Sequence, residues 1–231
     1  MESMREQIDA PAGFAPYADI RTDSYVMLAS LLGQPPSEDL RVILQNLKWD
    51  EAIPEQLDHA LRALRQAAED YPLAAMKEEF DRLFVGLGCG EVIPYASWYR
   101  ENMIQSLPLV SLRSDLVRLG IVRRSGSHET EDHAAALCEV MAIISQDSNG
   151  CSHGTQADFF QQHIASWMGT YFEDLQSAKN AGFYRTVGLF GSSFLEFECR
   201  YLGCHLNPIP NKKRRRKTRC SGNSPATEGC F

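Results

Sequence analysis

The stretch TEDHAAALCEVMAIISQ, residues 130–146, predicts an α-helix that buries one face. Thr130 can cap the beginning of this helix, and the carboxylates of Glu131 and Asp132 would favour the positive end of its dipole. Apolar residues then recur at intervals of three and four, which is the spacing of one helix face and not of a strand. They are Ala136, Leu137, Val140, Met141 and Ile144. This stripe is expected to face the protein core.

The same helical spacing continues along the chain on both sides of this stretch. No segment alternates apolar and polar residues as a half-buried strand would, and no repeat recurs at a fixed period. Prolines and serines stand where helices would begin, and glycines stand where they would end. Further helices are expected at 23–33, 37–48, 54–71, 72–84, 97–106, 108–119, 155–178 and 183–202. The predicted fold class is therefore all-α, a single helical-bundle-like domain of about nine to eleven helices.

Residues 207–231 differ in composition from the rest of the chain and predict a disordered basic tail after an all-helical domain of residues 1–206. Residues 212–219 (KKRRRKTR) hold seven of the 23 basic residues, and Glu228 is the only acid after residue 211. The net charge of −7 thus divides into +6 for the tail and −13 for the preceding residues. An acidic domain is a poor match for a phosphate backbone, so no nucleic-acid partner is expected. A regulator that binds nucleic acid through the tail stays open as an alternative.

The overall composition is that of an ordinary globular protein. The 231 residues are 44% apolar and 23% charged, which suffices for one core. No stretch is apolar for long enough to span a membrane, and the N-terminus lacks the pattern of a secretory signal. Seven scattered cysteines do not form the dense, even set of a small secreted domain. A cytoplasmic protein without stable membrane insertion is expected.

Three groups of residues could carry chemistry, and their spacing favours none of them. His128 and His133 are five residues apart, whereas a zinc-binding pair on one helix face needs a spacing of four. The glycines of residues 86–90 (GLGCG) lack the third glycine and the preceding strand of a dinucleotide site. The cysteines of residues 199–230 match neither zinc-finger nor iron–sulfur spacings. We expect no enzyme, no metal and no cofactor; the alternative is a metal- or nucleotide-dependent hydrolase built on Asp132, His133 and the glycine loop.

Aromatic residues gather around the same glycine- and proline-containing loop. Phe80, Phe84, Tyr95, Trp98 and Tyr99 all lie within residues 80–99. Most aromatic residues at helical spacing belong to a core, but several of these are expected on a loop. Loop aromatics beside acidic residues are typical of a groove that binds a peptide.

Two strings resemble the signatures of a known family. They are FDRLFVGLGCGEVIPYASWY at residues 80–99 and ETEDHAAALCEVM at residues 129–141. In order and separation they resemble the TorD/DmsD family of cytoplasmic chaperones for molybdenum-containing redox enzymes, whose helical domain carries L-F-x-G, P-W-x-S-x-Y and E-P-x-D-H. The resemblance spans roughly residues 23–202. It departs at Tyr95, Ala96 and Thr130, where the family has Trp, an acidic residue and Pro.

The resemblance implies a region that binds a signal peptide, formed by the residues that match these signatures. The matching residues are Leu83, Phe84, Gly86, Pro94, Tyr95, Ser97, Tyr99, Glu129, Asp132 and His133. We expect His133 to face the groove or the helix cap, and Asp132 to bond to backbone or to the peptide. Since the two are neighbours on a predicted helix, they should point to different sides and not form a catalytic pair.

The function that the resemblance implies is binding of the twin-arginine signal peptide on the apo form of a molybdoenzyme. Such a chaperone prevents premature export and keeps the client, of dimethyl sulfoxide reductase, trimethylamine oxide reductase or formate dehydrogenase type, ready for cofactor insertion. The residues themselves suit this ligand, because an arginine pair followed by an apolar stretch requires carboxylates beside an apolar groove. Hinges near residues 120–128 and 147–155 leave both a monomer and a domain-swapped dimer open.

Overall fold

The computed structural model describes residues 18–49, 53–85, 90–101, 107–122, 129–146 and 150–206. This part of the chain contains ten α-helices, one π-helix and an isolated β-bridge, and no strand, which confirms the predicted all-α class. The predicted tail and Gly86 lie outside it. The helices are α1 (Ala18–Gly33), α2 (Glu38–Gln45), α3 (Glu55–Asp70), α4 (Leu73–Phe80), the π-helix η2 (Asp81–Val85), α5 (Ala96–Glu101), α6 (Leu107–Arg118), α7 (Ala134–Ile144), α8 (His153–His163), α9 (Met168–Ser177) and α10 (Phe183–Leu202).

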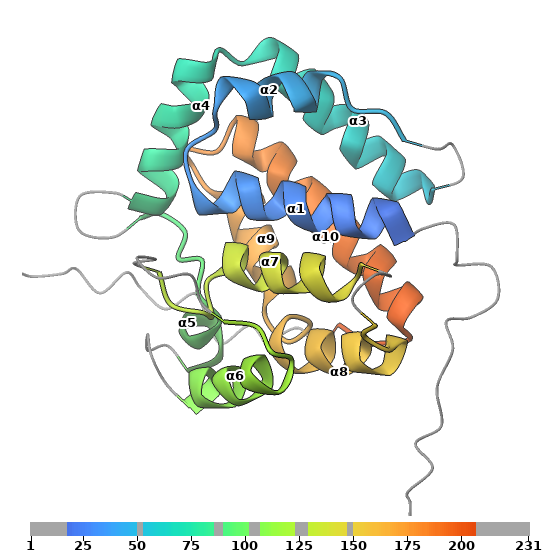
Figure 1. Ribbon diagram of the computed structural model, residues 1–231. Coiled ribbons are helices and arrows are strands. Elements are labelled where there is room, and N and C mark those ends of the chain that lie inside the picture. Colours follow the sequence, from blue (N-terminus) through green and yellow to red (C-terminus); the bar gives the residue numbers. More distant parts are fainter. Residues whose placement is uncertain are drawn as a thin grey trace, which may run out of the picture.

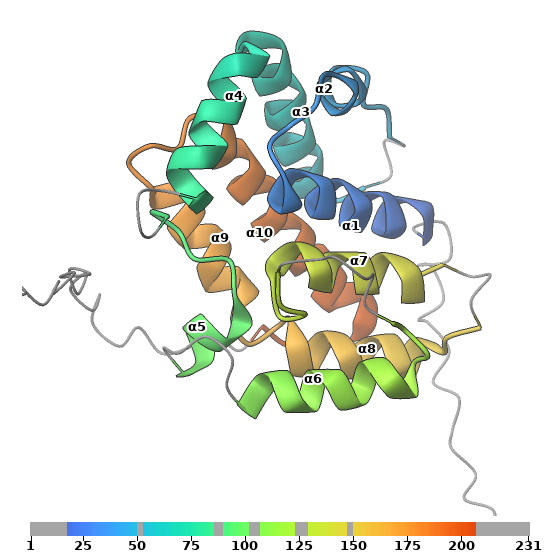
Figure 2. The ribbon, with the colours of Figure 1, turned by 60° about the vertical axis from the view of Figure 1, so that its left-hand side comes forward.

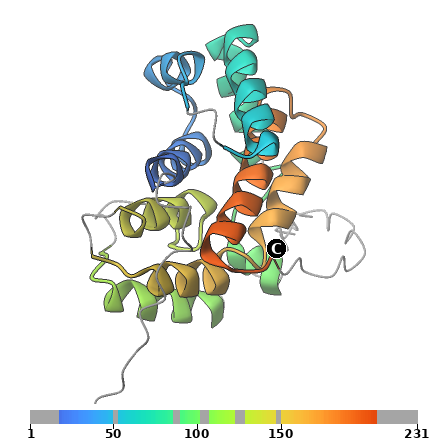
Figure 3. The ribbon, with the colours of Figure 1, turned by 90° about the vertical axis from the view of Figure 1, so that its right-hand side faces the viewer.

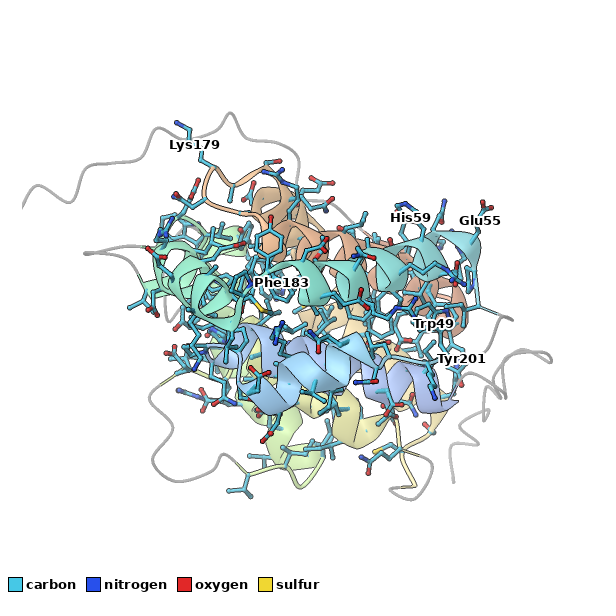
Figure 4. The ribbon with its side chains drawn as sticks, turned by 90° about the horizontal axis from the view of Figure 1, so that it is seen from above. Trp49, Glu55, His59, Lys179, Phe183 and Tyr201 are labelled. Atoms are coloured by element: carbon cyan, nitrogen blue, oxygen red, sulfur yellow. The ribbon has the colours of Figure 1, made fainter. Side chains whose placement is uncertain are left out.

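The longest helix, α10, lies at the centre of the arrangement and passes behind α1 and α7 in Figure 1. Helix α3 crosses it antiparallel, since Arg200 donates a hydrogen bond to Gln56 at one end and the rings of Tyr71 and Phe183 meet at the other. Figure 4 shows Phe183 among the helices and Tyr201 on the side where α3 begins. Helices α3 and α10 therefore form the central antiparallel pair of the upper part of the molecule as seen in Figure 1.

Helix α9 runs beside α10, on the side away from α1 (Figure 3). The approach is close enough to require a glycine, because a Cβ atom on Gly191 would lie 2.4 Å from the ring of Phe172. On the opposite side α1 and α7 pair antiparallel: the hydroxyls of Thr22 and Ser145 are 2.9 Å apart at one end, and Gly33 faces Ala135 at the other. Helices α6 and α8 lie side by side at the lower edge of the molecule (Figure 2).

A buried ion pair joins three of these helices. The guanidinium of Arg21 in α1 donates to both carboxylate oxygens of Glu198 in α10, at 2.7 and 2.6 Å, and to Gln156 in α8 at 2.9 Å. Tyr25 donates to the same carboxylate, and the ring of Tyr201 lies 4.0 Å from the guanidinium carbon. The side chains of Arg21 and Glu198 are 2% and 0% exposed. Both charged groups are thus desolvated, and hydrogen bonds within the protein replace those to water.

A second carboxylate fixes the beginning of α10. Glu79 in α4 accepts hydrogen bonds from the backbone N–H groups of Gly182, Phe183 and Tyr184, at 2.7, 3.0 and 2.7 Å. The first N–H groups of a helix have no partner within the helix, and their positive end favours an anion. Glu79 therefore caps a helix that begins more than a hundred residues later and ties α4 to it.

The helix expected at 23–33 begins earlier, at Ala18, and the one expected at 37–48 ends earlier, at Gln45. Three further elements differ from the sequence prediction. The single helix expected at 155–178 is wrong: residues 164–167 form turns that separate α8 from α9, where the indole N–H of Trp167 donates to the His163 carbonyl at 2.7 Å. The helix expected from residue 130 begins at Ala134, with His133 as its N-cap. The helix expected at 72–84 changes to π geometry at Asp81, a form common at functional sites.

We expect Arg21→Met to lower the free energy of unfolding by about 3–5 kcal/mol, because the Glu198 charge would stay buried without its partner. The double variant Arg21→Met/Glu198→Met should recover most of this loss, since an apolar pair needs no water. Urea unfolding followed by circular dichroism measures both. A double variant no more stable than Arg21→Met would show that the loss comes from packing and not from charge.

We expect Glu79→Gln to lower the free energy of unfolding by about 2 kcal/mol, because the three N–H groups lose an ionised acceptor. The matched control is Glu78→Gln, the adjacent residue, whose exposed side chain pairs with Arg82 one helical turn on. This control should change stability by less than about 0.5 kcal/mol. Equal losses in the two variants would contradict the capping role.

Candidate functional site

The two strings that carry the family resemblance meet in space. The backbone N–H of Ala134 donates to the Pro94 carbonyl at 2.8 Å, and that of Ala96 donates to the Asp132 carbonyl at 3.0 Å. Tyr95 and His133 form the antiparallel β-bridge between these two bonds. Residues 94–97 and 130–134, which we call the junction, therefore hold α5 and α7 together through their first residues.

Asp132 is the central side chain of the junction. It is 1% exposed, and one carboxylate oxygen accepts the N–H of Ser97 at 3.0 Å while the other accepts the hydroxyl of Thr130 at 2.5 Å. The expectation that Asp132 bonds to backbone is thus confirmed. Both oxygens are engaged inside the protein, so Asp132 acts on the site by holding the first turn of α5 in place.

His133 caps α7 with its ring. Its Nδ1 accepts the N–H of Ala135 at 3.1 Å, so the proton of the neutral imidazole is on Nε2. Burial lowers the pKa of His133 to about 4, and the neighbouring Asp132 offsets this only in part. The ring packs edge-on against Tyr95 at 5.0 Å. The expectation that His133 faces the helix cap is therefore confirmed, while the expected placement of Asp132 and His133 on one helix is wrong because both precede α7.

The exposed part of the site is formed by Tyr95 and Glu129, and the mostly buried Glu131 follows two residues on. Tyr95 is half-buried and its hydroxyl donates to the exposed carboxylate of Glu129. Glu131 accepts a two-pronged hydrogen bond from Arg113 in α6, at 3.2 and 3.0 Å. Carboxylates that meet solvent beside an aromatic ring can bind a guanidinium group.

Leu83 and Phe84 do not lie on this surface. Leu83 is fully buried, and its carbonyl accepts the N–H of Val92, which connects the π-helix to the loop before the junction. The ring of Phe84 packs on Phe80 and Tyr184 at 4.9 and 5.3 Å. A Cβ atom at Gly90 would lie 2.5 Å from the Leu83 carbonyl oxygen, so the loop returns against the helix end only with glycine there. Both predicted residues support the site from the core.

Tyr99 lies on the far side of α5 and faces α9. Its hydroxyl donates to Asp174 at 3.0 Å, and its ring packs on Trp167 and Tyr171. Burial raises the pKa of Tyr99 well above its ordinary value, with Asp174 adding to the effect. The predicted site residues thus divide between a surface around Tyr95 and Glu129 and a buried set that positions it.

The sequence reasoning did not identify the pair Asp115–His163. Asp115 in α6 lies 2.6 Å from Nε2 of His163 in α8, and the two side chains are 10% and 3% exposed. Burial lowers the pKa of His163, although Asp115 opposes the shift. This pair fixes the inner face of α6 on α8. One signal could have revealed it: Asp115 interrupts the apolar stripe of Leu109, Leu112 and Leu116.

Among the residues described, no group of three or more His, Cys, Asp or Glu side chains is placed to hold a metal ion. Nor does any described helix combine the length and apolarity needed to cross a bilayer.

An all-α protein in which these two signatures pair belongs to the class of redox-enzyme chaperones that the sequence resembles. The family model described as nitrate reductase delta subunit matches residues 50–173, which is more than half of the chain. The chain belongs to this family, within its TorD/DmsD group of chaperones. The predicted resemblance is confirmed.

Known proteins named Chaperone protein TorD align with most of the chain. The one from Vibrio cholerae is 24% identical over 196 residues, covering 76% of this chain and 89% of the relative. The one from Aliivibrio salmonicida is 24% identical over 203 residues, covering 79% and 94%. The one from Vibrio atlanticus is 22% identical over 178 residues, covering 72% and 82%. These relatives support a chaperone for redox-enzyme maturation.

We expect acid to destabilise the protein through His133. Its pKa is about 4 in the folded protein and about 6.5 in an unfolded chain, so the unfolded state binds the proton first as pH falls. The contribution of the neutral His133 to the free energy of unfolding is therefore fully present above pH 6.5. It is lost as the pH falls toward 4, and the loss reaches about 3 kcal/mol.

The variant His133→Asn keeps a side-chain acceptor at the N-cap but has no group that titrates. Urea unfolding at pH 7.5 and pH 4.5 should show a smaller acid loss in the variant than in the wild type. Equal losses in both proteins would mean that another group causes the acid sensitivity.

Proposed function

We propose that this chaperone binds the twin-arginine signal peptide of a molybdenum-containing oxidoreductase in its apo form. Binding would keep the client from premature export and ready for insertion of its cofactor. The client would be of the dimethyl sulfoxide reductase, trimethylamine oxide reductase or formate dehydrogenase type, and the chaperone would act in the cytoplasm without covalent chemistry.

The observation that carries the proposal is the exposed carboxylate of Glu129, next to the junction and bonded to Tyr95, with Glu131 two residues further along the chain. Both glutamates precede the buried Asp132 in the chain, and the hydroxyl of the half-buried Tyr95 donates to Glu129. A carboxylate accepts a guanidinium group through two parallel hydrogen bonds, and an aromatic ring offers it a flat face. Two arginines in sequence would thus meet the exposed carboxylate of Glu129 and, close by in the chain, that of Glu131, which now pairs with Arg113.

The buried residues of the signature have a positioning role in this proposal. Asp132 and Ser97 hold α5, and His133 holds α7, so the loop that carries Glu129 has a defined shape before a ligand arrives. A preformed site loses less conformational entropy on binding than a flexible one. This explains why chemically reactive residue types occur at positions with little access to solvent.

The charge of the molecule supports the same ligand. Residues 1–211 carry a net charge of −13, which attracts a cationic peptide from a distance and raises its rate of encounter. The two groups that a hydrolase would need, Asp132 and His133, are both engaged by backbone or hydroxyl groups within the protein. Their environment favours binding over catalysis.

Calorimetric titration with a synthetic twin-arginine signal peptide tests the proposal. We expect the wild type to bind the peptide and to bind its twin-lysine version more weakly, because lysine cannot form two parallel bonds with a carboxylate. Glu129→Gln should weaken binding by about fivefold, the value of one exposed ion pair.

The matched control for this experiment is Glu139→Gln, which removes an exposed carboxylate of α7 outside the junction. It should leave the affinity unchanged while altering the net charge equally. A wild type that binds none of several twin-arginine peptides would refute the proposed function. Equal weakening in both variants would mean that Glu129 acts only through the net charge of the protein and does not contact the peptide arginine.

A further inference from the structure

Helix α6 carries apolar residues on its solvent side as well as on its inner face. Its inner face buries Leu109, Leu112 and Leu116 and is fixed to α8 by the pair Asp115–His163. An amphipathic surface helix would carry polar residues on the other face. On α6, Val110 and Val117 lie among such polar residues with exposed fractions of 61% and 79%. Helix α6 lies at the outer edge of the arrangement in both Figure 1 and Figure 2.

The two valines belong to a shallow groove. Val110, Arg113, Ser114 and Val117 line a hollow of about 540 Å³. Their spacing of three, four and seven residues places them in one stripe, about 10 Å long, on the solvent side of the helix. Most of the solvent-exposed lining of this hollow is apolar. It can receive aliphatic side chains of a bound segment.

The same groove ends at a carboxylate that already holds a guanidinium group. Arg113 lines the hollow and reaches from it to Glu131 in the segment before α7, where two of its nitrogens bind two oxygens. The side chain of Arg113 is 53% exposed and that of Glu131 only 15%. Glu131 is therefore the fixed partner and Arg113 the one that solvent, or another cation, can replace.

We propose that the outer face of α6 binds the apolar stretch of the signal peptide, and that one peptide arginine replaces Arg113 on Glu131. This inference rests on the proposed function and specifies where its ligand lies. The peptide's arginine pair would span Glu129 and Glu131 at the junction. Its apolar stretch would continue over Val110 and Val117, which solvent now covers.

The chemistry of the surface favours this occupant over a second copy of the chain. A peptide with arginines next to aliphatic residues matches both parts of the surface, the carboxylate and the valines. For a second copy no pair of adjacent arginines next to an aliphatic stretch is identified among the described residues, so only the two valines would contribute. That area is far below the roughly 800 Å² per partner of a stable interface.

Replacement of Arg113 also gives selectivity. A peptide arginine forms the same two bonds that it breaks, so the exchange itself changes the free energy little, and the apolar contacts decide the affinity. A lysine in the same place would lose the two-pronged geometry and could not displace Arg113 equally well. Arg113 is thus expected to act as a competitor that excludes weaker cations.

The test uses the full chain and two synthetic peptides. Both carry an arginine pair; in one it is followed by a leucine- and alanine-rich stretch, in the other by serine and glycine. For the apolar peptide, Val117→Asp should weaken binding by about tenfold and Arg113→Gln should strengthen it by about threefold. For the polar peptide, Val117→Asp should have no effect. The controls are Val42→Asp, at an exposed valine of α2, and Arg118→Gln, at an exposed arginine of α6 that pairs with Asp115.

The outcomes separate this inference from the proposed function. A wild type that binds neither peptide overturns both. Binding of the apolar peptide that Val117→Asp leaves unchanged overturns the α6 surface alone and keeps the proposed function. If Val117→Asp instead converts a dimer to a monomer in light scattering and leaves peptide affinity intact, the face belongs to a second copy and the inference fails. Unfolding curves for each variant show that the fold is retained, as expected for exposed positions.

Discussion

The arrangement of the helices depends on one buried ion pair, Arg21 with Glu198. Glu198 lies in the middle of the core on α10, where an unpaired carboxylate would cost several kcal/mol, so Arg21 of α1 has to reach it. Gln156 of α8 and Tyr25 complete the bonds, and each one fixes the rotation of a helix about its axis. Apolar packing alone tolerates small rotations, whereas this network accepts one orientation only. The position of α1 then determines that of α7, which pairs with it.

The junction depends in turn on the position of α7. Only when the beginning of α7 is held against the core can His133 cap it and Asp132 turn back toward Ser97 of α5. The polar groups near the site therefore work in layers. The innermost set orients helices, the junction orients a loop, and the outer glutamates meet solvent. Each layer leaves fewer conformations open to the next, and the site is formed before a ligand binds.

Sequence patterns predicted most of the fold because most helix ends have a local cause. Prolines and serines begin α2, α3 and α4, and the bounds of α10 follow its apolar stripe. The turn between α8 and α9 was not predictable, since residues 164–167 contain neither Pro nor Gly. At this turn His163 makes a long-range contact with Asp115, and the indole of Trp167 bonds to the His163 carbonyl. For the same reason the resemblance identified the residues of the junction but not which of them are exposed. Their exposure depends on how residues 94–97 align with residues 130–134, which are far apart in the chain. The bond between Arg113 and Glu131 is long-range in the same sense.

Two arginine–glutamate pairs with the same chemistry thus have opposite roles in this account, one permanent and one exchangeable. The difference lies in how far the side chains are exposed to solvent. Arg21 and Glu198 are 2% and 0% exposed, so separating them leaves a charge without water or partner, and the pair is permanent. Arg113 is 53% exposed, and water can solvate it as it leaves Glu131. Glu131, at 15%, is the less solvated partner, so in the proposed exchange one guanidinium takes the place of another on it. In the proposed exchange, Arg113 pairs with Glu131 while no peptide is bound. A peptide arginine that brings apolar contacts of its own then takes the place of Arg113.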